Sequence, residues 1–204
     1  MVKVLFYSLP ECDFEEVLRY AGAGKTSDGK NEDMAEIVKE CTEEAKIVRG
    51  RVCFEKYKIS VENGKVKFPF AEIESESLSK NLSGCSSAVV FAATVGIGID
   101  RLIRKYGSTD TVKALFMQAI GTERVEALCD TFCRDLSEKV KRNGYSLKPR
   151  FSPGYGDLSL DVQKKITEAT QCAKNIGVTL NDGMLMSPSK SVTAIVGLYK
   201  GEER

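Results

Sequence analysis

The chain has 204 residues, no histidine and a formal net charge of +1 at pH 7. The length allows one domain with a sizeable core, and the balanced charge excludes proteins that bind nucleic acid or anionic membranes through a strongly basic surface. Without histidine, Ser-His and Cys-His nucleophiles and the commonest metal ligand are excluded, so any chemistry must rest on carboxylates, Arg, Lys, Tyr, Cys or a bound cofactor.

The first half of the chain alternates strand-like and helix-like patterns. We expect a strand over 1–7, a short helix from Asp13 to Tyr20, an acidic amphipathic helix from Asn31 to Val48, a β-hairpin from Lys56 to Phe70, and a short helix within Glu72 to Leu82. The hairpin turn is placed at Asn63-Gly64, which is typical of type I′ turns. Acidic residues soon after the first strand argue against a signal peptide, and no apolar run could cross a membrane, so we expect a cytoplasmic protein.

Residues 22–26 (Gly-Ala-Gly-Lys-Thr) resemble the end of a phosphate-binding P-loop. That motif requires a glycine five residues before Gly24, where this chain has Arg19, and it must follow a strand. Because these residues follow a predicted helix instead, we reject a P-loop here.

The second half begins with a continuously apolar segment, Ser87 to Val95, which predicts a central strand covered on both faces. After it we expect a long helix that runs from Ser108, its N-cap, to Arg142, and Gly121 could introduce a bend in it. A second helix should run from Ser159 or Leu160 to Asn175 and end at Gly177. A short strand over Val178 to Leu180 and a last strand over Ser191 to Leu198 complete the prediction. Strands and helices mix without a regular βαβ alternation. We therefore predict an α+β fold, with a largely antiparallel twisted sheet packed with helices, as a single domain over 1–204.

The long predicted helix carries a core stripe at four-residue spacing, made of Leu128, Phe132, Leu136 and Val140. Glu126 lies roughly opposite this stripe and has small neighbours. This arrangement leaves room beside the helix for another group, and a plain solvated face is the alternative interpretation.

Cysteine occurs seven times without a Cys-x-x-Cys pair, so we predict neither a disulfide framework nor a zinc site. Cys129 and Cys133 are four residues apart on the predicted helix and share one face. They could form half of a metal site or a redox pair, although small buried thiols are the commoner case.

Residues 148–157 (Lys-Pro-Arg-Phe-Ser-Pro-Gly-Tyr-Gly-Asp) combine two prolines with two glycines. Pro149 and Pro153 each fix φ and restrain the preceding residue, while Gly154 can adopt a backbone conformation closed to other residues. We therefore expect a stiff loop that holds Arg150 and the ring of Tyr155 in place. A rigid guanidinium suits a carboxylate or phosphate, and an aromatic ring can stack on a base; an ordinary surface turn with a solvated arginine is the alternative.

The segment Arg150-Phe151-Ser152-Pro153-Gly154-Tyr155 resembles the Arg-x-x-Pro-Gly-Tyr signature of the activation domain of cobalamin-dependent methionine synthase. Three further segments are similar to that family in order and spacing: Ala93-Thr94-Val95-Gly96 followed by Asp100-Arg101, Glu126-Ala127-Leu128-Cys129-Asp130, and Pro188-Ser189-Lys190-Ser191-Val192. The resemblance covers residues 85–200, whereas residues 1–80 are more divergent. In length the chain is similar to free-standing forms of this domain.

This resemblance implies a domain that binds S-adenosylmethionine (AdoMet) and supports reductive methylation of oxidised cobalamin (vitamin B12) carried by a separate methionine synthase chain, the methyltransferase of methionine biosynthesis. A flavodoxin- or ferredoxin-type donor would supply the electron. By the resemblance, Arg150 would pair with the AdoMet carboxylate, Glu126 would face its amino or sugar groups, and the adenosine would be lined by Ser152, Gly154 and Tyr155. No catalytic or metal-binding residue is implied, because AdoMet and cobalamin carry the chemistry.

The chain departs from the family where Pro-Ala-Cys-Pro after the Gly-Tyr pair is replaced by Gly156-Asp157-Leu158-Ser159. The family's N-terminal AdoMet-binding aspartate and the aromatic residues past its last strand have no counterpart that we can match. AdoMet could therefore bind weakly, or only when a partner's cobalamin domain closes over it. Three alternatives stay open: an activator of another corrinoid protein, a non-catalytic binding or regulatory module on the same fold, and a thiol-redox protein that uses Cys129 and Cys133.

Overall fold

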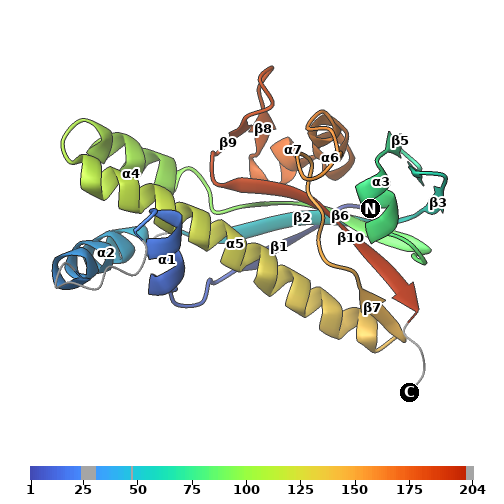
Figure 1. Cartoon of the computed structure of the whole chain (residues 1–204), viewed down its shortest axis with the longest axis horizontal. Coiled ribbons are helices and arrows are strands. Elements are labelled where there is room, and N and C mark those ends of the chain that lie inside the picture. Colours follow the sequence, from blue (N-terminus) through green and yellow to red (C-terminus); the bar gives the residue numbers. More distant parts are fainter. Residues whose placement is uncertain (24–30, 47, 201–204) are drawn as a thin grey trace.

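The computed structural model describes residues 1–23, 31–46 and 48–200. Its centre is a five-stranded sheet in the order β1-β2-β6-β10-β7, in which each pair of neighbouring strands is antiparallel. The bounds of these strands are Lys3–Tyr7 (β1), Gly50–Lys58 (β2), Ser87–Thr94 (β6), Ser191–Lys200 (β10) and Tyr145–Leu147 (β7). Helices pack on both faces of the sheet (Figure 1). The predicted α+β fold with a largely antiparallel sheet is therefore confirmed.

Two smaller sheets accompany the central one. One contains β3 to β5 and the other β8 and β9, with bounds Ser60–Glu62 (β3), Lys65–Phe68 (β4), Ala71–Glu74 (β5), Thr179–Leu180 (β8) and Met186–Ser187 (β9). The predicted turn at Asn63-Gly64 is confirmed, because φ is 51° and 74° at these residues, as a type I′ turn requires. The hairpin is shorter than predicted, since residues 56–58 pair with β6 as part of β2.

Strand β6 is covered on both faces, as its apolar run predicted, and all eight of its residues are buried. Side chains alternate along a strand, so successive residues enter different clusters. Val89, Phe91 and Ala93 pack in the core formed with helix α5, whereas Ala88 and Val90 pack on the opposite side with helix α6.

The 31-residue helix α5 (Thr111–Lys141) crosses one face of the sheet (Figure 1). The predicted N-cap at Ser108 is wrong, because Ser108 has helical backbone angles and follows a separate helix, α4 (Gly98–Gly107). The cap of α5 is Asp110. Its backbone is extended, so its carboxylate can accept a hydrogen bond from the N–H of Lys113, at 3.0 Å.

Gly121 lies within α5, and the helix is continuous through it. A Cβ atom at this position would lie 2.6 Å from Cγ2 of Ile99 in α4 and 2.9 Å from Cγ of Lys190. Glycine therefore allows the two helices and the Lys190 stem to approach closely, because any larger residue would overpack this contact.

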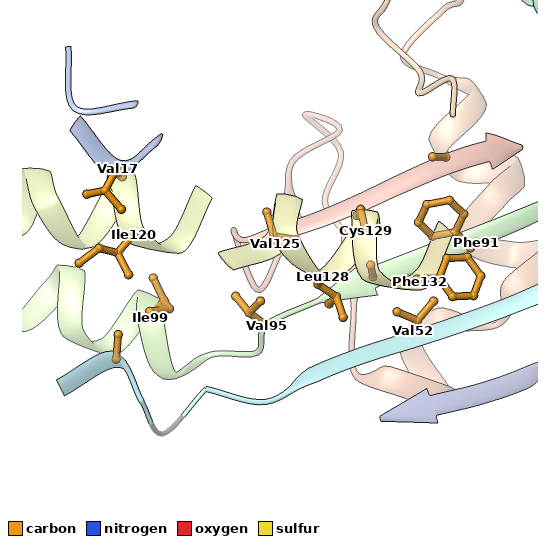
Figure 2. Packing of buried hydrophobic residues seen from close by; sticks show 14 of the residues in the cluster. Val17, Val52, Phe91, Val95, Ile99, Ile120, Val125, Leu128, Cys129 and Phe132 are labelled. Atoms are coloured by element: carbon orange, nitrogen blue, oxygen red, sulfur yellow. The ribbon is translucent and has the colours of Figure 1, made fainter. Parts of the chain in front are cut away.

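The main core lies between α5 and the sheet (Figure 2). Phe132 of α5 is 1% exposed, and its ring centroid lies 4.9 Å from that of Phe91 and 5.1 Å from that of Phe54. The rest of the predicted core stripe is buried or packs against this core, namely Leu128, Leu136 and Val140.

The opposite face of the sheet is covered by α6 (Val162–Thr170) and α7 (Cys172–Ile176). The prediction of one helix reaching Asn175 is wrong, because Gln171 takes left-handed backbone angles (φ 48°, ψ 41°) and separates the two. The side-chain amide of Asn175 donates to the carbonyl of the residue before this break, at 2.9 Å, which satisfies an otherwise free acceptor. The predicted stop at Gly177 is confirmed by its φ of 74°.

Three further helices complete the fold. Helices α1 (Phe14–Tyr20) and α2 (Asn31–Ala45) pack against α5, and α3 (Glu76–Asn81) packs beside β4. All three were predicted, although α2 ends three residues before the predicted Val48. Residues 24–26 of the rejected P-loop lie outside the described residues. Across the described ranges, no helix combines the length and the apolar composition needed to cross a membrane.

Candidate functional site

The loop that carries Arg150 is held against the edge of β10. Phe151 exchanges two backbone hydrogen bonds with Ile195, both 2.8 Å long, and the N–H of Lys148 donates to the carbonyl of Gly197 at 2.9 Å. Phe151 packs into the cluster on the α6 side of the sheet. Because neighbouring side chains on extended backbone point to opposite sides, Arg150 is directed towards α5.

Two glycines shape the tip of this loop. Gly154 has φ 91° and Gly156 has φ 57°, a backbone region that residues with a side chain rarely adopt. The N–H of Gly154 donates to the carbonyl of Leu158 at 2.8 Å, which closes the turn. The expectation that Gly154 adopts a conformation closed to other residues is confirmed.

Helix α3 holds the loop at both ends. The side-chain amide of Asn81 donates to the carbonyl of Pro149 at 3.2 Å. At the other end, the Asp157 carboxylate accepts from the hydroxyl of Ser75 at 2.5 Å and from the N–H groups of Glu76 at 2.7 Å and Ser77 at 3.1 Å. These hydrogen bonds hold the pKa of Asp157 far below its usual range, and the bond from Ser75 makes the largest contribution. Asp157 is one of the positions at which the chain departs from the family pattern, and it fixes the loop.

Arg150 meets two carboxylates of α5. One guanidinium nitrogen, Nη2, donates to Glu126 and lies 3.3 Å from Asp130. The other, Nη1, is buried and has no hydrogen-bond partner among the described residues. Burial acts to lower the pKa of Arg150, but its interactions with Cys129, Glu126 and Asp130 outweigh burial and the pKa is raised. The guanidinium is therefore held charged, and its Nη1 nitrogen has no partner in the described part of the chain.

A pocket of about 370 Å³ opens beside this ion pair. Its lining includes four of the five predicted site residues, Glu126, Arg150, Ser152 and Tyr155. Gly154 forms the turn behind them. The ring of Tyr155 is 69% exposed and is available to cover a ligand.

The opposite wall of the pocket consists of residues that the sequence did not single out as ligand contacts. These residues come from α6, β9 and β10: Gln163, Met186, Ser191, Val192 and Thr193. The Oε1 atom of Gln163 and the Oγ1 atom of Thr193 are buried without a hydrogen-bond partner among the described residues. Ser191 and Val192 belong to a segment that resembles the activation-domain family. For Gln163 and Thr193 the signal was a polar residue at a core-facing position, which cannot be recognised before the register of the strand and helix is known.

The segments that resemble the activation domain converge near this pocket. The N–H of Ser189 donates to Asp100 at 3.1 Å, and the hydroxyl of Ser191 donates to that of Thr94 at 2.8 Å. Glu126 and Arg150 form an ion pair, and both line the pocket together with Ser191 and Val192. Residues of three of these segments therefore line the pocket, and the fourth contacts it through Ser191.

An acidic cleft of about 450 Å³ shares Glu126 and Arg150 with the pocket. Besides Arg134 and Arg150, its charged lining is acidic and consists of Glu11, Asp13, Glu16, Glu123, Glu126 and Asp130. Two of these carboxylates are paired with arginines outside the lining, Glu123 with Arg124 and Glu16 with Arg19. The charge that remains in the cleft is negative.

Cys129 and Cys133 lie below this ion pair as free thiols. Burial raises the pKa of Cys133 to about 11 and that of Cys129 further still. A thiol must ionise to react or to bind a metal, so these two cysteines are poor redox groups at neutral pH. In the described ranges, no group of three or more Cys, Asp or Glu side chains is placed to hold a metal ion.

Comparisons with known proteins find the same fold. No model of a protein family matches the sequence, and no curated protein matches it. Among solved structures, the crystal structure of the MetH reactivation domain bound to AdoHcy is similar, with a TM-score of 0.76 and 12% sequence identity. The match covers 100% of this chain and 80% of that one. At this level of identity the likeness shows the fold, an α+β domain with an antiparallel sheet packed against helices.

Proposed function

We propose that the pocket binds AdoMet, with the amino-acid end of the ligand between Arg150 and Glu126. An α-amino acid carries a carboxylate beside an ammonium group, and the pocket presents a guanidinium beside a carboxylate. The observation that carries the proposal is this pair, brought together from a helix and a loop. Nη1 of Arg150 is buried there and has no hydrogen-bond partner within residues 1–23, 31–46 and 48–200. That nitrogen can donate to the ligand carboxylate without breaking the contact to Glu126.

The charge of the site supports a cationic ligand. Arg150 contributes one positive charge, whereas Glu126 and Asp130 contribute two negative charges. AdoMet carries a net charge of +1 because of its sulfonium, and its demethylated product S-adenosylhomocysteine (AdoHcy) is neutral overall. The acidic cleft beside the pocket extends this preference.

The fold gives the proposal its biological setting. The similar MetH structure is a reactivation domain with AdoHcy bound, and AdoHcy is what remains when AdoMet gives up its methyl group. We propose that this chain supports the reductive methylation of cobalamin on a separate methionine synthase chain, with an electron from a flavodoxin- or ferredoxin-type donor. Its own residues would bind and orient AdoMet and would supply no acid or base.

The test is a calorimetric titration of the purified chain with AdoMet, beside Arg150→Ala. If the guanidinium holds the carboxylate in a largely desolvated site, the variant should lose about 2–4 kcal/mol of binding free energy. Equal binding by both proteins would refute the assigned site. If neither binds, the titration is repeated with a cobalamin-loaded methionine synthase, and failure there would refute AdoMet binding and leave a non-catalytic module.

Binding of AdoMet alone does not identify the protein that is served. A reactivation assay with oxidised methionine synthase, an electron donor and AdoMet addresses this point directly. Recovery of methionine synthesis only when the chain is present supports the proposal. An activator of another corrinoid protein would bind AdoMet but leave this enzyme inactive.

A further inference from the structure

The wall of the pocket formed by α6 and β10 contains two polar side chains that the proposed amino-acid contacts do not use. Gln163 is 7% exposed and Thr193 is 2% exposed. Oε1 of Gln163 and Oγ1 of Thr193 are buried, and neither has a hydrogen-bond partner among the described residues. Both residues line the pocket.

The packing of the two elements explains why these side chains occupy one wall. Val162 of α6 and Ile195 of β10 belong to the same apolar cluster. Gln163 follows Val162, and Thr193 lies two residues before Ile195 and therefore on the same face of the strand. The backbone N–H of Gln163 donates to the carbonyl of Leu160 at 3.0 Å. Within its side chain, the Oε1 atom is buried and has no hydrogen-bond partner in the described part of the chain.

Buried polar atoms without partners are uncommon in folded proteins, because removing them from water without a hydrogen bond is unfavourable. Two of them on one wall of a pocket indicate that a ligand supplies the missing partners. The ligand must then offer a hydrogen-bond donor to the carbonyl oxygen of Gln163 in this wall.

Adenine offers the complementary pattern. A glutamine amide can accept from the exocyclic N6 amino group of adenine and donate to its ring N7, a bidentate pairing that other bases do not reproduce. Around these polar groups the pocket is lined by Phe151, Tyr155 and Met186, which present apolar surface to the faces of a planar ring.

We propose that Gln163 is the residue that selects adenine, with the Thr193 hydroxyl as a second contact to the nucleoside. This assignment rests on the proposed function. It places the base at the wall formed by α6 and β10, and the amino-acid end of the ligand at Arg150 and Glu126. Separate groups of the pocket would then bind the adenine end and the amino-acid end of AdoMet.

The experiment compares calorimetric affinities for AdoHcy and S-inosylhomocysteine, in which an oxygen replaces the N6 amino group. The wild-type chain should prefer AdoHcy by at least about tenfold, because the inosine base cannot donate to Oε1 of Gln163. Gln163→Leu should reduce this preference to less than about twofold. Gln163→Met, which keeps an unbranched side chain, is the second variant if the leucine variant folds poorly.

A second readout separates recognition from a structural role. Gln163→Leu and Thr193→Val each remove a buried polar atom that has no partner among the residues the structure describes. The thermal midpoint without ligand should therefore stay equal or rise, while affinity for AdoHcy falls. A residue needed only for folding would instead lower the midpoint. A lower midpoint for both Gln163→Leu and Gln163→Met would overturn the inference.

The remaining outcomes are distinct. If the wild-type chain binds AdoHcy and inosine analogue equally, or if both Gln163 variants keep the preference, the assignment of Gln163 is overturned and AdoMet binding stands. If the wild-type chain binds neither AdoHcy nor AdoMet, with or without a cobalamin-loaded methionine synthase, the proposed function and the inference are both overturned.

Discussion

Helix α5 contributes to two regions that differ in how their buried groups are satisfied. On its inner side, Phe132 packs against Phe54 and Phe91 in an apolar core. On another side, Glu126 pairs with Arg150 at a pocket in which three buried polar atoms have no partner among the described residues, on Arg150, Gln163 and Thr193. The core gains its stability from complete burial, whereas the pocket keeps polar groups unsatisfied at a cost in stability. This difference separates the residues that stabilise the fold from those that we propose to contact the ligand.

Phe132→Ala should produce the largest effect, and it should act on stability. Removing a fully buried ring from an aromatic cluster leaves a cavity, which lowers the free energy of unfolding by about 3–5 kcal/mol. Chemical denaturation monitored by circular dichroism measures this loss. The matched control is Tyr155→Ala, which removes a mostly exposed ring from the pocket rim and should change the same free energy by less than about 0.5 kcal/mol. Similar losses in the two variants would mean that the pocket rim belongs to the stabilising core.

Arg150→Lys should produce the next largest effect, on affinity for AdoMet. A lysine keeps the charge but cannot hold Glu126 with one nitrogen and a ligand carboxylate with another. We expect a loss of about 2–4 kcal/mol in binding free energy, close to that of the alanine variant, with little change in the unfolding midpoint. Calorimetry provides the affinity. The control is Arg134→Lys, at an exposed arginine of the adjacent acidic cleft, which should bind AdoMet as the wild type does. If Arg150→Lys also binds like the wild type, the proposal that Arg150 uses two nitrogens to hold Glu126 and the ligand carboxylate is wrong.

The sequence predicts the parts of both regions that depend on local rules. The apolar run of β6, the type I′ turn and the stiff loop around Arg150 each follow from the conformational limits of a few adjacent residues. The predicted N-cap of α5 lies two residues too early. Ser108 and Asp110 both have side chains suited to an N-cap, and the backbone conformation after α4 determines that Asp110 is the cap.

Other features depend on contacts between distant segments. The break at Gln171 requires a left-handed residue in an otherwise helical pattern, and nothing in the local sequence demands it. Oε1 of Gln163 and Oγ1 of Thr193 have no partner in the described part of the chain. Their place on one wall of the pocket follows only from the packing of α6 against β10. The residue patterns predict Arg150 and Glu126 as separate candidates, and the family resemblance assigns both to one ligand; the structure adds that they form an ion pair.

Asp157→Asn should have the smallest effect, because it loosens the support of the pocket and leaves its walls intact. The carboxylate accepts three hydrogen bonds from residues 75–77, which lower the pKa of Asp157 in the folded state. A lowered pKa means that this stabilisation is complete above the unfolded-state pKa of about 3.9 and is lost as the pH falls below it towards the folded-state pKa. At pH 7 the variant should therefore melt a few degrees below wild type, and the difference should shrink in acid. Thermal unfolding from pH 7 down to about pH 3 tests this expectation. The control is Asp161→Asn, at an exposed residue four positions further along the chain, whose melting temperature should equal that of the wild type at every pH. If the midpoint difference for Asp157→Asn does not depend on pH, the charge of Asp157 is not what holds the loop to α3.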